Sequence, residues 1–276
     1  MKPSTYLFIA TLLTTEALHC QLTTIDQFIQ IKPSEIITGN REIGKYDVTL
    51  KWQNIDPING TKFNCNAVNA SYITLPNDSV AWNNVTLAQI SDFQQTVFSG
   101  SPLPSFNGFS YKINATNFLN DQFYHSISPE QRDLAKWLVS DAIQMQGLAR
   151  YIFDSLSFNK PFSPSFLKNY DITFNDWVTF TSRYQKLTWT GITKYNNQVC
   201  AIIKFESLYN PLKVDNSQMS VMGRSLYYGE LWISLSDKQV EYAAMTEDVI
   251  MKLKSSAFPD EQLIELQREV AFKKIN

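Results

Sequence analysis

The stretch "GRSLYYGELWISLSDKQVEYA", from Gly223 to Ala243, carries the clearest strand pattern of the chain. Apolar residues occupy alternate positions on both sides of the polar turn "SDKQ", which is the period of a strand with one buried face. The pattern predicts a hairpin in which Leu226–Ser234 runs antiparallel to Gln239–Thr246. Lys238 in the turn is expected to be exposed, so that replacing it with alanine costs little. The side chains expected on the buried face are Leu231, Ile233, Leu235, Val240, Tyr242 and Ala244.

The apolar pattern changes parity shortly after this hairpin. It moves from even positions to Val249, Met251 and Leu253, and one extra residue near Met245–Asp248 would produce the change. A β-bulge is therefore predicted there, and bulges bend the strand that carries them. A bent antiparallel sheet of this kind can form the wall of a cavity or the seat of a helix.

Strand patterns extend on both sides of the hairpin. The stretch "QKLTWTGITKYNNQVCAIIKF" predicts two strands about a turn at Asn196 and Asn197, residues that tolerate left-handed backbone. Alternation in "EIGKYDVTLKWQNI" predicts an early strand, and "REVAFKKI" predicts a last one. Residues 56–120 are rich in Asn, Ser, Thr and Pro, which indicates short strands with long loops.

One long helix is predicted over about 129–157. Ser128 is the expected N-cap, Pro129 takes the first helical position and Gln131 completes a capping box. Apolar residues then recur at helical spacing. The sequence thus predicts an α+β, strand-dominated fold, in which a curved antiparallel meander shaped like half of a barrel packs against one long helix.

The meander "LTWTGITKYNNQVCAIIKF", continued by "GRSLYYGELWISLSDKQVEYAAMTEDVIMKLK", resembles in its rhythm the C-terminal sheet of exported bacterial proteins that carry no assigned function. It is also similar to the curved half-barrel of periplasmic lipoprotein carriers of the LolA/LolB type, in which a helix covers an apolar concave face. The likeness spans about residues 183–254, and no functional motif of the carriers matches it residue by residue. The resemblance therefore implies a fold and no activity.

The N-terminus predicts export. Lys2 precedes the apolar run Tyr6–Leu13, which is too short to span a bilayer and has the length of a secretory signal core. Cleavage after Ala17 or after Cys20 fits the residues that follow this run. We expect a signal peptide at residues 1–20 and a single periplasmic or extracellular domain at 21–276. Within it, strands and loops are expected at about 42–120 and the meander at about 183–275.

Composition and motifs argue against several classes of function. The formal net charge of −2, with no basic run, gives no electrostatic reason to expect nucleic acid as a partner. No later run is long and apolar enough for a transmembrane helix. No GxGxxG, Walker A or HExxH pattern occurs, so no cofactor is predicted. His125 is the only histidine after the signal peptide, and neither Cys65 nor Cys200 has a CxxC partner, so neither a catalytic triad nor a metal site is predicted.

Two sets of residues in the meander are candidates for function. Aromatic side chains can stack on sugar rings or line an apolar pocket, although strands also favour them as core residues. The aromatic candidates are Trp189, Tyr227, Tyr228, Trp232 and Tyr242. Carboxylates can serve a glycosidase or simply occupy solvated strand positions. The carboxylate candidates are Glu230, Glu241, Glu247 and Asp248.

Three hypotheses about function follow. The first is a non-catalytic exported protein that binds a hydrophobic or lipid-like ligand in a cleft between sheet and helix. The second is a structural or surface-interaction protein with a protein partner, which is favoured if the helix fills the concave face. The third is a carboxylate-dependent hydrolase. Independently of these, Cys65 and Cys200 either pair as a disulfide in an oxidising compartment or stay as buried free thiols.

Overall fold

The computed structural model describes residues 43–75, 77–165, 170–174, 178–182, 185–215, 219–255 and 260–275. The predicted signal peptide at residues 1–20, with its alternative cleavage points after Ala17 and Cys20, lies outside the described residues. The fold below is therefore that of the segment expected to follow it.

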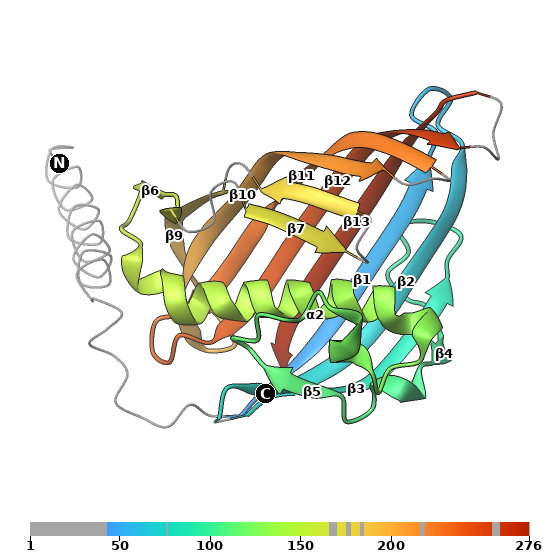
Figure 1. Cartoon of the computed structure of the whole chain (residues 1–276). Coiled ribbons are helices and arrows are strands. Elements are labelled where there is room, and N and C mark those ends of the chain that lie inside the picture. The colour runs from blue at the N-terminus through green and yellow to red at the C-terminus, as the bar shows by residue number, and fades with distance from the viewer. Residues whose placement is uncertain are drawn as a thin grey trace, which may run out of the picture.

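The described strands form one antiparallel sheet of thirteen strands, which confirms the predicted fold class. Its continuous path runs β4-β3-β2-β1-β13-β12-β11-β10-β8-β7, while β5 pairs with β3, β9 with β10 and β6 with β9. Among the described strands, β4 and β7 do not pair with each other, so the curved sheet stays open (Figure 1). The strands are β1 (Gly44–Ile55), β2 (Lys62–Thr74), β3 (Ser79–Gln89), β4 (Ser101–Pro102), β5 (Ser110–Lys112), β6 (Pro161–Phe162), β7 (Tyr170–Phe174), β8 (Val178–Ser182), β9 (Gln185–Tyr195), β10 (Gln198–Asp215), β11 (Met219–Ser234), β12 (Val240–Ser255) and β13 (Gln262–Ile275).

The first and last described strands lie side by side within this path. Strand β1 pairs with β2 on one side and with β13 on the other, so that Val48 lies opposite both Ala70 and Phe272. This pairing joins the early strands and the meander in one continuous sheet. Alternation in the sequence could not predict it, because a period of two fixes the face on which a residue lies but not the neighbouring strand.

A nearly continuous helical segment covers residues 129–155, close to the predicted range of 129–157. It consists of η4 (Pro129–Gln131), α2 (Arg132–Gly147), the π-helical turn η5 (Leu148–Ile152) and η6 (Phe153–Ser155). Two further 3-10 turns precede it, η2 (Pro104–Phe106) and η3 (Asp121–Tyr124). Pro129 takes the first helical position as predicted, but the Ser128 side chain makes no capping hydrogen bond. The Gln131 side chain does not reach back to Ser128 and instead accepts a hydrogen bond from Ser105 Oγ. The helix is confirmed and the predicted capping box is wrong.

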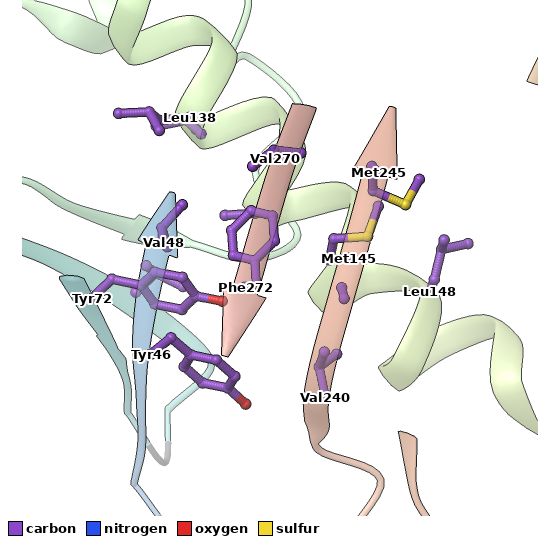
Figure 2. Packing of buried hydrophobic residues seen from close by; sticks show 14 of the residues in the cluster. Tyr46, Val48, Tyr72, Leu138, Met145, Leu148, Val240, Met245, Val270 and Phe272 are labelled. Atoms are coloured by element: carbon purple, nitrogen blue, oxygen red, sulfur yellow. The ribbon is translucent and has the colours of Figure 1, made fainter. Parts of the chain in front are cut away.

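Helix α2 lies across one face of the sheet (Figure 1). We call this the inner face; it carries Val48, Met245 and Phe272, and the opposite side of the same strands is the outer face. Leu138 and Met145 of the helix point toward this inner face, where all five side chains belong to one buried cluster (Figure 2). Burial of this apolar surface is the main force that holds the helix on the sheet.

The predicted hairpin is confirmed, but its bulge lies elsewhere. Strands β11 and β12 are antiparallel, with Tyr228 opposite Thr246. The register shifts between Trp232 and Ile233, which makes Glu241 the extra residue. The bulge therefore lies at the start of β12, and the prediction near Met245–Asp248 is wrong.

The position of this bulge decides which hairpin residues are buried. Val240 faces inward as predicted, but beyond the extra residue the odd positions face inward, and Ala243 and Met245 are buried. Tyr242 and Ala244 were predicted to share the buried face, and they lie on the outer face instead. An aromatic residue next to two alanines leaves the parity of a strand ambiguous, which is why the sequence pattern misplaced the shift.

The hairpin turn is more constrained than predicted. Lys238 has a positive φ of 56° and is 8% exposed, and its ammonium lies 2.6 Å from a carboxylate oxygen of Asp154. This residue therefore ties the turn to the end of the helical segment. The expectation that alanine at Lys238 costs little is not supported, because that change would remove a partly buried ion pair.

Two of the early strands are longer than predicted. Strands β2 and β3 contain 13 and 11 residues, where the composition predicted short strands, whereas β4 and β5, with 2 and 3 residues among loops, agree with that prediction. In β2 the polar residues Asn69 and Ser71 alternate with the buried Val68 and Ala70. Polar residues at outer-face positions are compatible with a strand, so the composition alone was misleading here.

Candidate functional site

The five aromatic residues predicted to line a ligand cleft are divided between the two faces of the sheet. Trp189 and Tyr227 lie on the inner face and are buried. Tyr228, Trp232 and Tyr242 lie on the outer face, where Tyr228 is opposite Thr246 and the other two are opposite each other. The five residues therefore do not form one site.

The two inner-face aromatic residues are part of the packed core. The Trp189 ring contacts Phe153 and Phe158 with centroid separations of 5.8 Å each, and its Nε1 donates to the Gly191 carbonyl at 2.8 Å. The Tyr227 hydroxyl also has a partner within the protein, because it donates to Asp141. The rings of Trp189 and Tyr227 pack against other side chains, and their polar groups form hydrogen bonds within the protein. This is the core-packing alternative that the sequence left open.

The inner face contains a buried charged network that joins α2 to the sheet. Arg268 of β13 donates from its two terminal nitrogens to Asp141 of α2, at 2.5 and 3.2 Å. Its Nε donates to Glu247 of β12 at 2.8 Å. Each carboxylate also accepts a hydrogen bond from a hydroxyl group. Tyr227 Oη donates to Asp141 at 3.0 Å, and Ser225 Oγ donates to Glu247 at 2.7 Å. Pairing and hydrogen bonding together make buried charge tolerable.

The four carboxylates predicted for a hydrolase do not converge. Glu247 belongs to the inner-face network, and Glu241 is buried with its Oε1 2.5 Å from the Lys274 ammonium. Glu230 and Asp248 lie on the outer face of β11 and β12. A general acid or base must reach the reacting atoms, so the two carboxylates held in buried ion pairs are poor candidates.

The two cysteines are free and buried. Cys65 lies on β2 and Cys200 on β10, and four strands separate these two in the sheet. Neighbouring strands are about 4.8 Å apart, so this separation is far beyond the Cα distance of about 6 Å that a disulfide requires. Of the two alternatives, the structure contains the free thiols, and burial raises the pKa of Cys200 to about 12.

A pocket of about 320 Å³ opens on the outer face, and we call it the outer-face pocket. Two neighbouring rows of side chains form its floor. One row consists of Tyr228, Thr246 and Glu269 on β11, β12 and β13, and the next consists of Asp248, Gln267 and Gln53 on β12, β13 and β1. The two rows are adjacent because their members lie two residues apart along β12 and β13, and the pairing of β1 with β13 adds Gln53 to the second row.

Residues from two further segments complete the pocket. Lys62 lies at the start of β2, and Asp92, Phe93 and Gln94 follow β3. Phe93 is buried in a small second cluster on the outer side of the sheet, with Cys65 among its members. This packing holds the segment after β3 against the strands and fixes one wall of the pocket.

Sequence reasoning identified only part of this set. Tyr228 and Asp248 were named as candidates, but Gln53, Gln267 and Glu269 were not. All three occupy odd, outward-facing positions of β1 and β13, which alternation does reveal. Their convergence depends on which strands pair, and the sequence pattern gave no signal for that.

A chain of amide hydrogen bonds crosses the floor of the pocket. Gln53 Nε2 donates to Gln267 Oε1 at 2.7 Å, and Gln267 Nε2 donates to Glu265 Oε1 at 2.8 Å. An ionised carboxylate only accepts hydrogen bonds, so Glu265 sets the orientation of both amides. Gln53 is 4% exposed, and its Oε1 accepts no hydrogen bond from any described residue. A buried acceptor without a donor costs about 1–3 kcal/mol.

Negative charge accumulates around Asp248 in this pocket. Tyr228 Oη donates to Asp248 Oδ2 at 3.4 Å. Burial, followed by the negative charge of Glu265, raises the pKa of the Asp248 carboxyl above its ordinary value, and the Tyr228 hydrogen bond only partly opposes the rise. Burial, Asp248 and Glu269 likewise raise the pKa of the Tyr228 hydroxyl. The strongest charges that act on this part of the pocket are thus of one sign.

Two further observations apply to the described residues. No group of three or more His, Cys, Asp or Glu side chains among them could hold a metal ion. Within the same ranges, no helix has the length and apolar character needed to cross a membrane.

No protein-family model matches the chain, and no curated protein matches it.

Proposed function

We propose that the chain is a surface-interaction protein that recognises its ligand or partner through the outer-face pocket. The observation that carries the proposal is the set of polar side chains that five adjacent strands, β11, β12, β13, β1 and β2, and the segment after β3 direct into one pocket. Ligand sites are usually concave, and convergent polar groups within them fix the orientation of the ligand. The buried, unpaired oxygen of Gln53 supports the same conclusion, since native proteins rarely leave such a group unsatisfied.

The alternative of a hydrophobic ligand between sheet and helix has weaker support. Leu138 and Met145 of α2 pack directly against the inner face, so protein side chains occupy the space that such a ligand would need. The network of Asp141, Arg268 and Glu247 also opposes displacement of the helix, because separation would leave buried charges without partners.

A polar fragment library tests the proposal. We expect some members to bind the full chain and to shift the NMR signals of residues that line the outer-face pocket. Thr246→Trp places an indole in the floor of the pocket and should abolish these shifts. Thr193→Trp, a half-exposed threonine of β9 outside the pocket, serves as the matched control and should leave them unchanged.

Two results would contradict the proposal. One is the absence of any fragment whose binding is lost in Thr246→Trp and kept in Thr193→Trp. The other is a set of apolar fragments whose shifts map to the inner face, around Leu138 and Phe272, which would return the hydrophobic-ligand hypothesis to first place.

A further inference from the structure

The outer-face pocket has more hydrogen-bond acceptors than donors. Gln53 Oε1 is buried and accepts no hydrogen bond from the described residues, and the carboxylates of Asp248 and Glu269 line the same floor. The chain of amides cannot reverse to correct this, because reversal would direct the Gln267 oxygen at the Glu265 carboxylate. A ligand that donates hydrogen bonds matches this set of groups, whereas one that only accepts them does not.

The charge of the lining favours a cation over a neutral donor. Three carboxylates line the pocket, from Asp92, Asp248 and Glu269, against the cations Lys62 and Arg268. The Arg268 guanidinium is already engaged on the inner face by two carboxylates. Among the residues that line the pocket, Lys62 is therefore the cation left to balance the three carboxylates.

One exposed aromatic ring lies where a cation can contact it. Tyr228 is 41% exposed at the pocket, with its hydroxyl against Asp248. The buried Phe93 ring on the neighbouring wall is already used by the protein, since the Lys51 ammonium lies 6.0 Å from its centroid and donates to the Phe93 carbonyl at 3.0 Å. Carboxylates beside aromatic faces are a recurrent way to bind organic cations.

The described residues do not support a metal ion as this cation. No group of three or more side chains of the kinds that ligate metals comes together in them. A pocket of about 320 Å³ is also far larger than a single ion needs and is at the small end of the range for organic ligands.

On the basis of the proposed function, we infer that the outer-face pocket captures an organic cation, either an alkylammonium or a guanidinium group. Its N–H groups would donate to Asp248 and Glu269, and the enclosed oxygen of Gln53 would accept one after a shift of its side chain. The same chemistry occurs in a free polyamine and in a lysine or arginine side chain of a partner protein. The two sources share the head group and differ in what surrounds it.

The inference also predicts how binding depends on pH. The Asp248 carboxyl must be ionised to attract a cation, so affinity should increase as the pH rises through its elevated pKa. Other charged or titratable groups around this position would modify the dependence. They are Glu247, Glu265, Glu269, Asp92, Tyr228, Lys51, Lys62 and Arg268.

Calorimetry of the full chain at about 0.15 M salt tests the inference with four probes. Two are cations, spermidine and N-acetyl-arginine amide, and two are controls, the neutral polyol mannitol and inorganic phosphate. We expect at least one cation to bind and neither control to do so. Asp248→Asn should weaken the binding about tenfold or more, the loss expected for one charge-assisted hydrogen bond. Glu230→Gln, on the outer face of β11 outside the pocket, should change it less than about twofold.

The outcomes separate this inference from the proposed function. Suppose that neither cation binds, and that mannitol or phosphate binds to the unchanged chain but not to Thr246→Trp. The pocket is then a binding site, but not for cations. If fragments that depend on Thr246 are absent altogether, the proposed function fails as well. Equal weakening by Asp248→Asn and Glu230→Gln would mean that general surface charge attracts the cation, and this would overturn the inference. Tighter binding of spermidine than of the arginine derivative would favour a free polyamine as the source.

Discussion

The two faces of the sheet handle charge in opposite ways. On the inner face, Asp141 and Glu247 both pair with Arg268, and each also accepts a hydrogen bond from a hydroxyl group. On the outer face, Asp248 has a single long hydrogen bond from Tyr228, and its strongest charged neighbour is another carboxylate.

This difference shows how structural charges can be distinguished from charges available to a ligand. Both sets come from the same strands, since Glu247 and Asp248 are consecutive residues of β12 and point to opposite faces. The inner-face charges are paired with one another and hydrogen-bonded, and they stabilise the position of α2. The outer set is left with unused acceptors at a pocket, which is the state expected of a site that binds something else.

The largest expected effect comes from placing a carboxylate on each face of β11 in turn. Ile233 is 1% exposed on the inner face, and Met222 is 67% exposed on the outer face of the same strand. Ile233→Asp would bury an unpaired charge and should lower the free energy of unfolding by about 5 kcal/mol or more. Met222→Asp should change it by about 0.5 kcal/mol or less.

Urea denaturation of both variants measures this difference. Similar losses in the two would mean that the inner and outer faces of β11 are wrongly assigned. Such a result would also remove the basis for the outer-face pocket, because the register of β11 places Tyr228 there.

A smaller difference is expected between two tryptophans that sequence reasoning treated alike. Trp189 is buried between Phe153 and Phe158, whereas Trp232 is half-buried against Tyr195 and Tyr242 on the outer face. Trp189→Ala should lower the free energy of unfolding by about 3–5 kcal/mol and Trp232→Ala by about 1–2 kcal/mol. Denaturation curves followed by far-UV circular dichroism check both values. A larger loss for Trp232→Ala would make the outer aromatic cluster a second core.

Much of the fold could be predicted because it depends on local patterns. The long helix, the hairpin of β11 and β12 and the turn at Asn196 and Asn197 follow from helical spacing, strand alternation and residues that accept positive φ. The misplaced bulge has a local cause as well. Tyr242 has the side chain of a core residue but lies on the outer face. Glu241 has the side chain of an exposed residue but is buried, where it pairs with Lys274.

The candidate site could not be predicted as a whole because it is assembled by long-range pairing. Gln53 and Gln267 are 214 residues apart in the sequence and 2.7 Å apart as hydrogen-bonded groups. Each is an ordinary polar residue at an outward strand position, so nothing local distinguishes it. Export, in contrast, depends on the N-terminal pattern alone and stays a prediction.

The smallest expected effect concerns Asp248 itself and has an unusual sign. Because burial and Glu265 raise the pKa of its carboxyl, the folded protein binds this proton more tightly than the unfolded chain does. The stability that Asp248 contributes is therefore fully present below the unfolded pKa of about 4 and is lost as the pH rises through the folded value. Asp248→Asn removes the charge and should raise the melting temperature at pH 7, with little effect near pH 3. The gain should be about 0.5 kcal/mol or less, because solvent screens a partly exposed carboxylate. Glu230→Gln is the control for general charge removal. A lower melting temperature of Asp248→Asn at pH 7 would mean that a cation within the chain already balances this carboxylate, and the contrast between the two faces would then disappear.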